Sequence, residues 1–108
     1  MTRPRRPLGR ALDAVGDPLR RRVLLALLEH GPDAASGVDA EAVAPSTADP
    51  DQLTTSLVHV HLPKLSDLGY VRWDRETTYV RRGPAFSEVA PLVRLLHDHR
   101  TDLPYAWP

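Results

Sequence analysis

Small polar side chains recur on one side of a helix predicted over residues 50–68. At about 100° per residue they fall on a single arc, opposite the apolar residues of the same helix. Hydroxyl, amide and imidazole groups can bind the base edges and phosphates of DNA, and the alternative is an ordinary solvated helix face. The polar residues chosen from this arc are Gln52, Thr55, Ser56 and His59.

Basic side chains form a second set of candidate functional residues, because arginine and lysine can bind phosphate. A hairpin predicted over residues 70–82 has four arginines, which could straddle phosphates or enter a minor groove, or be ordinary strand-surface residues. Three more stand near the start of a helix that begins at Pro18. The basic residues assigned to a DNA-contacting surface are Arg20, Arg21, Arg22, Lys64, Arg72, Arg75, Arg81 and Arg82.

The charge is neutral in total but unevenly distributed. Residues 1–22 contain seven arginines and two aspartates, whereas residues 23–63 contain six acids and no lysine or arginine. Residues 70–82 contain four arginines and two acids. Two basic ends around an acidic middle favour an anionic partner, although solvated faces would give the same count.

Catalytic and cofactor chemistry has little support in the sequence. The chain has no cysteine, which excludes disulfides, cysteine-ligated zinc and thiol catalysis. It has no glycine-rich phosphate loop, nucleophile elbow or metalloprotease motif, and its acids show no paired placement. We therefore expect neither an enzyme nor a bound cofactor.

Two histidine pairs, His59/His61 and His97/His99, raise the question of a metal site. Residues two apart on a helix point about 200° apart, so neither pair can hold one ion unaided. We expect no metal site, with a site shared across a dimer as the alternative. His61 falls on the apolar side of its helix and is predicted to be a core histidine.

Length and composition indicate one globular domain. The chain has 108 residues, 42% of them apolar and 26% charged. The longest apolar run, Val23 to Leu28, is too short to span a bilayer. The basic N-terminal stretch lacks the apolar segment of a signal peptide, so we expect a cytoplasmic protein.

Helix signals are clear at several points of the chain. A short amphipathic helix is predicted from Pro7, and a central buried helix follows from a cap at Asp17 to a stop at Gly31. Asp49 and Pro50 begin the polar-arc helix, which has an outward-facing and kinking Pro63. Gln52 three residues after Asp49 suggests a capping box.

Residues 31–50 are less informative. A short helix over Asp39 to Ala44 is possible there and would bring only Val38 and Val43 to the core. After Gly69 the period changes to two, which predicts a two-stranded hairpin with Val71, Trp73 and Val80 on one face.

The order helix, helix, short helix, long helix, hairpin, helix describes a mainly α winged helix-turn-helix with a two-stranded β-hairpin. The segment "VHVHLPKLSDLGYVRWD" resembles the recognition-helix-to-wing junction of ArsR-like regulators. The "HLPKL" segment is similar to short winged-helix proteins of halophilic archaea, and the resemblance covers about residues 8–82. The residues that match the junction are His61, Leu62, Leu65, Gly69, Tyr70 and Val71.

This resemblance implies a transcriptional regulator that binds double-stranded DNA as a homodimer. The alternative is a winged-helix module for protein–protein contact, with the acidic middle and the last helix as its surface. The implied organisation is a basic arm over residues 1–7, the winged domain over 8–82, a dimerisation helix over 83–100 and an irregular tail over 101–108.

The dimer prediction depends on the apolar surface of the last helix, which is kinked at Pro91 or begins there. This surface is larger than a one-sided helix in a small domain needs to cover. The alternative is that the helix folds back over the hairpin and completes the core of the monomer, with Trp73 beneath it. The predicted interface residues are Leu8, Leu12, Phe86, Val89, Leu92, Val93, Leu95 and Leu96.

Overall fold

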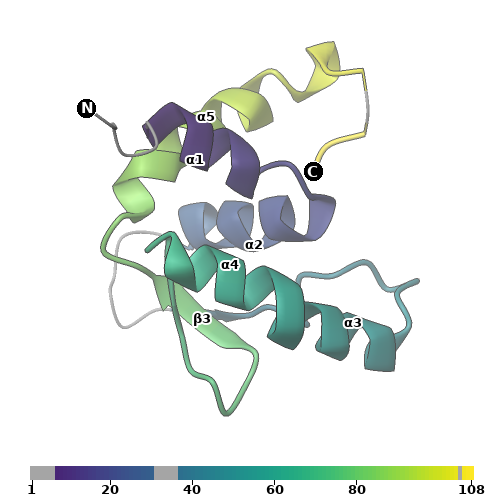
Figure 1. Cartoon of the computed structure of the whole chain (residues 1–108). Coiled ribbons are helices and arrows are strands. Elements are labelled where there is room, and N and C mark those ends of the chain that lie inside the picture. Colours follow the sequence, from purple (N-terminus) through teal and green to yellow (C-terminus); the bar gives the residue numbers. More distant parts are fainter. Residues whose placement is uncertain (1–6, 31–36, 105) are drawn as a thin grey trace.

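The computed structural model describes residues 7–30, 37–104 and 106–108, which form a mainly helical protein with a small antiparallel sheet (Figure 1). Most of the predicted N-terminal arm and the stop at Gly31 lie outside the described residues. The elements are α1 (Pro7–Ala14), α2 (Pro18–Glu29), β1 (Gly37–Asp39), α3 (Pro50–Ser56), the π-helical η1 (Leu57–His61), α4 (Leu62–Asp67), β2 (Val71–Trp73), β3 (Tyr79–Arg82), α5 (Phe86–Asp98) and the short 3-10 helix η2 (Arg100–Asp102).

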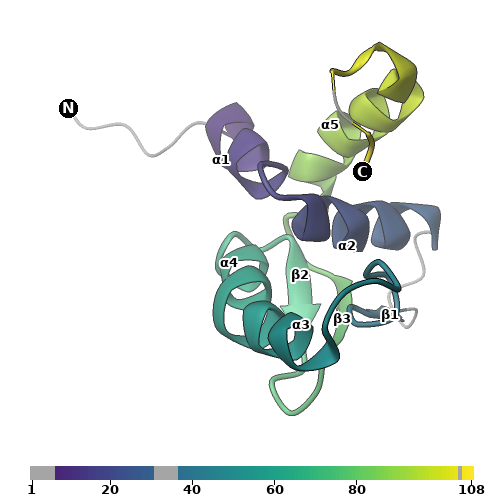
Figure 2. The same cartoon turned by 90° about the vertical axis from the view of Figure 1, so that its right-hand side faces the viewer.

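Helix α2 lies at the centre of the molecule, as the sequence predicted. In both views α1 and α5 lie on one side of it, and α3, α4 and the sheet lie on the other (Figures 1 and 2). Its apolar residues are buried on both sides, which is why the predicted helix is apolar on nearly every face. The buried apolar residues of α2 are Val23, Leu24, Leu25 and Leu27.

The predicted helix starts are confirmed by their hydrogen bonds. The carboxylate of Asp17 accepts from the backbone N–H groups of Leu19, at 2.8 Å, and Arg20, and Pro18 is the first helical residue. At α3, Asp49 accepts from the backbone N–H of Asp51 at 3.0 Å. Each aspartate satisfies N–H groups that have no partner within the helix.

Pro63 follows a widened stretch of helix. The chain is helical from Pro50 to Asp67, but its middle, η1, is π-helical, and the N–H of Leu62 donates to the oxygen of Leu57 five residues earlier. In a regular α-helix the ring of Pro63 would crowd the carbonyl of His59. An extra residue in the preceding turn moves that carbonyl, so the expected kink is replaced by a π turn.

The sheet has three strands among the described residues, in the order β1-β3-β2. The predicted helix over Asp39 to Ala44 is wrong, because Gly37–Asp39 pairs antiparallel with β3 and turns follow. Pairing satisfies backbone groups along β3 that a two-stranded hairpin would leave open. Val38 is buried opposite Val80, and so reaches the core as expected.

The β2–β3 hairpin has the predicted faces. Gly69 ends the preceding helix with a φ of 78°, and Trp73 then lies opposite Val80 on the inner face. Arg72 lies opposite Arg81 on the outer face. The hairpin therefore shows a cationic pair to solvent.

Helix α5 is part of the core of the single chain. It begins at Phe86, continues through an exposed Pro91, and packs mainly on α2 and α1. Phe86, Val89 and Val93 are almost completely buried within the single chain, so their assignment to a dimer interface is wrong. The alternative prediction is confirmed in part: α5 completes the core of the single chain, but it packs mainly on α2 and α1 and not over the hairpin.

A polar contact joins α5 to the first helix. Arg10 Nε of α1 donates to the carboxylate of Glu88 at 3.2 Å, and the hydroxyl of Tyr70 donates to the same carboxylate. The two donors lower the pKa of Glu88, and burial raises the pKa of Tyr70. The contact spans 78 residues of sequence and fixes α1 against α5.

Candidate nucleic-acid interface

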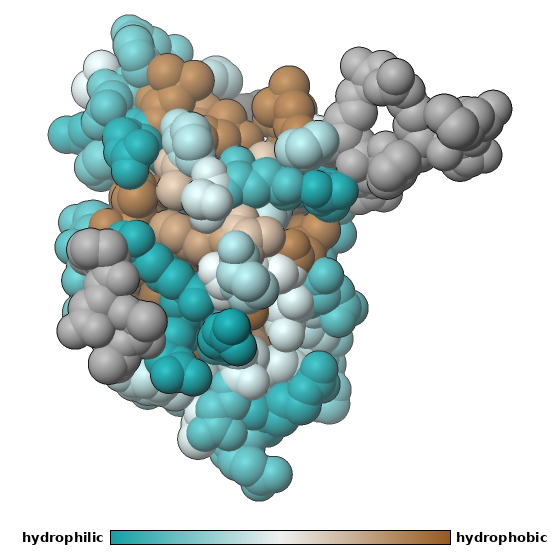
Figure 3. Space-filling view, turned by 90° about the vertical axis from the view of Figure 1, so that its left-hand side faces the viewer, coloured by the Kyte–Doolittle hydropathy of each residue, from teal (hydrophilic) through white to brown (hydrophobic). Residues whose placement is uncertain are grey.

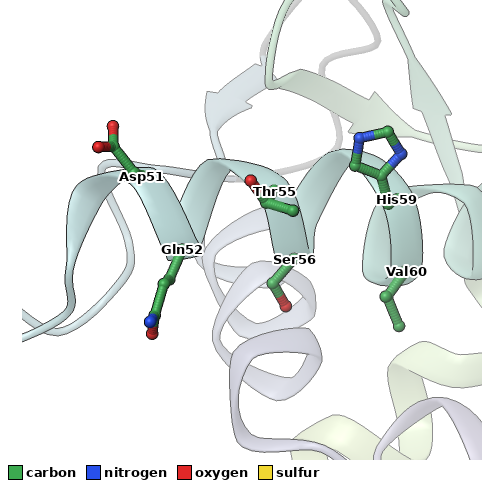
Figure 4. Close-up of a pocket in the computed structure, with 6 residues that line it drawn as sticks. All are labelled: Asp51, Gln52, Thr55, Ser56, His59 and Val60. Carbon is green, nitrogen blue, oxygen red and sulfur yellow. The ribbon is translucent and has the colours of Figure 1, made fainter.

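A shallow groove follows the exposed side of α3 and η1, and it brings together all four residues of the predicted polar arc. Figure 4 shows two rows of side chains along the helix, with Thr55 and His59 in one row and Gln52 and Ser56 in the other. We call this surface the α3–η1 groove; the residues that line it are Asp51, Gln52, Thr55, Ser56, His59 and Val60.

Val60 adds a hydrophobic group that the sequence analysis did not select. It is 54% exposed and lies at the end of the groove within the π turn. A side chain of this kind can contact the methyl group of thymine or an apolar group of a protein partner. The groove thus combines small polar groups with one apolar contact.

The α3–η1 groove is lined by uncharged side chains and one carboxylate. Asp51 is the charged residue among the described residues that line it, and no arginine or lysine of the described ranges does. Glu41 lies near the start of the same helix, where it accepts from the hydroxyl of Thr54 at 2.6 Å. Lys64 is bound to Asp13 of α1 at 2.7 Å. Among the described residues, the groove itself therefore offers no positive charge.

Three hairpin arginines remain exposed. Arg72 and Arg81 lie opposite one another, and neither side chain has an ion pair or hydrogen bond among the described residues. Like charges directly opposite on a sheet destabilise it, so a bound anion would relieve their repulsion. Arg75 lies over the ring of Trp73, with 5.1 Å between its guanidinium carbon and the ring centroid.

Arg82 is turned inward. Its Nε and Nη2 donate to the carbonyl oxygens of Leu27 and Leu28, each at 3.0 Å, and its guanidinium lies over the ring of Phe86. These carbonyls belong to the last turn of α2, where carbonyl oxygens have no N–H donor within the helix. Arg82 therefore caps α2 and does not contribute to an exposed basic surface.

Arg20 is also an internal cap, and the prediction that it contacts DNA is wrong. It is only 9% exposed, and it donates to the carbonyl oxygens of Ala14 at 2.9 Å and Asp13 at 3.1 Å. Arg21 donates in the same way to Val15 at 2.8 Å. Both arginines stabilise the end of α1, where positive charge is favoured. Arg22, half-buried, has no such partner among the described residues.

His61 is a buried core histidine, as predicted. Its Nδ1 lies 3.1 Å from Nη1 of Arg20. Because a guanidinium can only donate, Nδ1 is the acceptor and the ring is neutral, with its proton on Nε2 facing Asp17 at 3.7 Å. Burial lowers the pKa of His61 and Arg20 lowers it further, while Asp17 opposes them.

The histidine pairs do not meet at a metal site. His59 is exposed in the groove whereas His61 is buried, and His97 Nδ1 accepts from the indole of Trp107 at 2.9 Å. Within the described residues, no three histidines, aspartates or glutamates are close enough together to hold an ion.

An apolar surface remains where α1 and α5 lie side by side. Leu8 and Leu12 of α1 are 62% and 52% exposed, and Leu95 of α5 is 55% exposed. Leu92 and Leu96 are half-buried. Figure 3 shows apolar groups over the upper part of one face, above a hydrophilic hairpin side. The exposed part of the predicted dimer interface is thus Leu8, Leu12 and Leu95.

The family described as "Domain of unknown function (DUF7344)" matches residues 13–81, from the end of α1 into β3. No curated protein and no solved structure matches the chain. In the described ranges, no helix is both long and apolar enough to cross a bilayer.

Proposed function

The chain belongs to this family, since the match covers more than half of it, and we propose that it is a winged helix-turn-helix regulator that binds double-stranded DNA. In this proposal α3 and η1 form the recognition helix, and the β2–β3 hairpin is the wing. Its sequence resemblance to ArsR-like regulators over residues 8–82 supports the same assignment.

The proposal depends on one observation, the division of labour between the groove and the hairpin. The α3–η1 groove offers hydroxyl, amide and imidazole groups without basic charge, which suits the edges of bases. The side chains of Arg72 and Arg81 offer cations that have no partner in the described part of the chain, which suits phosphates. Phosphate contacts position a protein on DNA and base contacts give specificity.

A homodimer is part of this proposal. Two half-sites about one DNA turn apart require a two-fold partner. Leu8, Leu12 and Leu95 lie on neighbouring helices, and exposed apolar surface commonly marks an association site. The pairing of α1 and α5 with their symmetry copies would cover these leucines.

A second candidate function is contact with another protein through the same groove. Asp51 at the groove and Glu41 nearby disfavour a phosphate backbone, and the exposed Val60 suits a partner with its own apolar group. This candidate predicts no DNA affinity even at low salt.

The test is the salt dependence of binding to a random-sequence duplex, measured by fluorescence anisotropy. We expect the log–log slope of the wild type to become shallower by nearly two units in Arg72→Ala/Arg81→Ala, about 0.9 for each lost phosphate contact. Arg94→Ala, an exposed arginine of α5, is the matched control and should keep the wild-type slope. An unchanged slope in the double variant removes the hairpin from the interface, and absence of wild-type binding at low salt favours the second candidate.

Sedimentation of the intact chain tests the dimer. We expect a dimer for the wild type and a folded monomer for Leu8→Asp/Leu95→Asp, because both changes place charge on exposed apolar positions without entering the core. A folded, monomeric wild type at tens of micromolar would refute the interface.

A further inference from the structure

A hollow on the outer face of the sheet lies between the exposed arginines of the β2–β3 hairpin and a tyrosine. Its volume is about 180 Å³, smaller than the usual range for a whole drug-sized ligand. It therefore has room for one charged group of a larger ligand, with the rest of that ligand lying along the sheet. The residues that line the hollow are Arg72, Trp73, Asp74, Tyr79 and Arg81.

The two arginines form the cationic end of the hollow. Arg72 and Arg81 are directly opposite in the register of β2 and β3, which places their Cβ atoms about 5 Å apart. Neither guanidinium has an ion pair or hydrogen bond within the described ranges. A phosphodiester has two non-bridging oxygens and one negative charge. Each oxygen can accept from one guanidinium, and the charge offsets the repulsion between the two cations.

Tyr79 forms an aromatic platform at the other end of the hollow. It is 45% exposed, although it belongs to the middle strand of the sheet. A Cβ atom added to Gly37 of β1 would lie 2.5 Å from Cε1 of the Tyr79 ring. The ring therefore lies across β1, in the space that a side chain at residue 37 would take. The strand supports the ring from below, and its exposed area is available for stacking against another ring.

The carboxylate of Asp74 gives the hollow a direction. The backbone N–H of Asp74 donates to the carbonyl oxygen of Tyr79 at 3.2 Å, which places Asp74 beside the tyrosine and two residues along the chain from Arg72. Its Oδ1 accepts from the backbone N–H of Glu76 at 3.1 Å and so stabilises the turn. An anionic group is therefore favoured at the arginine end and a neutral ring at the tyrosine end.

We propose that this hollow binds one unpaired nucleotide of a single-stranded nucleic acid, with its phosphate between Arg72 and Arg81 and its base stacked on Tyr79. Residues two apart on a strand lie about 7 Å apart on one face, which leaves room for a sugar between phosphate and base. Stacking on an aromatic ring accepts every base, so we expect little sequence preference. The two arginines are shared with the proposed duplex surface, but the inference does not depend on duplex binding, because paired bases cannot reach Tyr79.

The test compares a short labelled oligothymidylate with an abasic strand of the same length, which keeps the sugars and phosphates, by fluorescence anisotropy at low salt. We expect the intact chain to bind the strand with bases about tenfold more tightly, because only that strand can stack. Oligouridylate of the same length distinguishes the two sources of an unpaired nucleotide, and binding of it alone would support the same site with RNA as the source. Equal affinity for the strands with and without bases, or no saturable binding to any of them, would overturn the proposal.

Two variants of one residue locate the base. Tyr79→Leu keeps an apolar side chain but loses the ring, so it should weaken binding of oligothymidylate about tenfold. Tyr79→Phe keeps the ring and should bind as the wild type does. Far-ultraviolet circular dichroism establishes that both are folded; if Tyr79→Leu is not, the abasic comparison decides, since it needs no variant. Equal binding by the two variants would contradict the proposal.

A duplex separates this inference from the proposed function. Tyr79→Leu should keep the wild-type affinity for a duplex, whose bases are paired, whereas Arg72→Ala/Arg81→Ala should weaken binding of both duplex and single strand. If Tyr79→Leu binds the single strand as the wild type does while duplex binding depends on the arginines, the inference fails and the proposed function stands. Ring-dependent binding of the single strand without duplex binding would give the reverse result.

Discussion

The junction between α1 and α2 and the β2–β3 hairpin are both rich in arginine, but they use it differently. At the junction, Arg20 donates to carbonyl groups of the last turn of α1, and Arg21 donates to the carbonyl of Val15, the residue after it. On the hairpin, Arg72 and Arg81 face solvent without partners among the described residues. A count of arginines therefore predicts a basic surface in both regions, and only one of them has it.

Arg82 shows that the difference is a matter of face and not of region. Arg82 is part of the hairpin in sequence, but its side chain binds the end of α2. It does so because it lies opposite Val71, on the inner face of the sheet. Its neighbour Arg81 lies opposite Arg72 on the outer face. Adjacent arginines on one strand thus have separate roles, one in stability and one available for binding.

The largest expected effect is that of Arg20→Ala on stability. The change leaves the carbonyls of Asp13 and Ala14 and Nδ1 of His61 without their donor in a buried setting. We expect the free energy of unfolding to fall by about 3 kcal/mol. Urea unfolding would measure it, with Arg22→Ala as the control, expected within about 0.5 kcal/mol of the wild type. A loss at Arg20 no greater than at Arg22 would contradict the capping role.

An intermediate effect is expected at the hairpin, where Arg82→Ala and Arg81→Ala should have opposite consequences. Arg82→Ala removes two hydrogen bonds to the end of α2 and should lower stability by about 1–2 kcal/mol. Arg81→Ala should leave stability within about 0.5 kcal/mol but make the salt dependence of DNA binding shallower. Unfolding and anisotropy titrations on both variants would show the crossed pattern; parallel losses in both would argue against the two faces.

The smallest effect is the pH dependence from His61, the histidine bound to Arg20. The pKa of His61 lies below its ordinary value of about 6.5, so between the two values the unfolded chain binds more protons. The free energy of unfolding should therefore fall as the pH is lowered below about 6.5, by at most about 1.4 kcal/mol per pH unit.

Two histidine variants isolate this contribution. His61→Gln keeps an acceptor for Arg20 but cannot titrate, and unfolding measured from pH 7.5 to 5.5 should depend less on pH than in the wild type. His59→Gln, at an exposed position two residues earlier, should keep the wild-type dependence. If the two variants have the same slope, His61 does not contribute.

Local signals in the sequence predicted the helix starts and the polar groove. An aspartate followed by proline is a strong signal for a helix start, because capping depends on a few adjacent residues. The two examples are Asp17 with Pro18 and Asp49 with Pro50. The groove followed from helical spacing, and the predicted hairpin faces from alternation along the strands. These features require no knowledge of distant packing.

The features that were missed depend on tertiary contacts. The strand β1 has three residues and forms only because β3 is there to pair with it. Likewise, Pro63 marks an irregular point in its helix, but the spacing of apolar residues does not distinguish a π turn from a kink.

The internal arginines could have been found from the sequence. Arg20 precedes Val23, Leu24 and Leu27 at helical spacing and therefore shares their buried stripe. Arg82 follows Val80 by two residues and therefore shares its inner face. A long basic side chain can lie along a buried face when carbonyl groups at its end accept its hydrogen bonds, so position on the helix or strand decides whether an arginine is exposed.

The contact between Arg10 and Glu88 has a consequence for the order in which the protein folds on the ribosome. Helix α1 is synthesised before α5, and Glu88 leaves the ribosome 78 residues after its partner Arg10. Until α5 emerges, the apolar groups of α2 that it covers face water. We therefore expect the nascent chain to stay partly collapsed until α5 can pack on α2 and α1. We expect the domain to fold late and as one unit, with α5 as the segment that commits it.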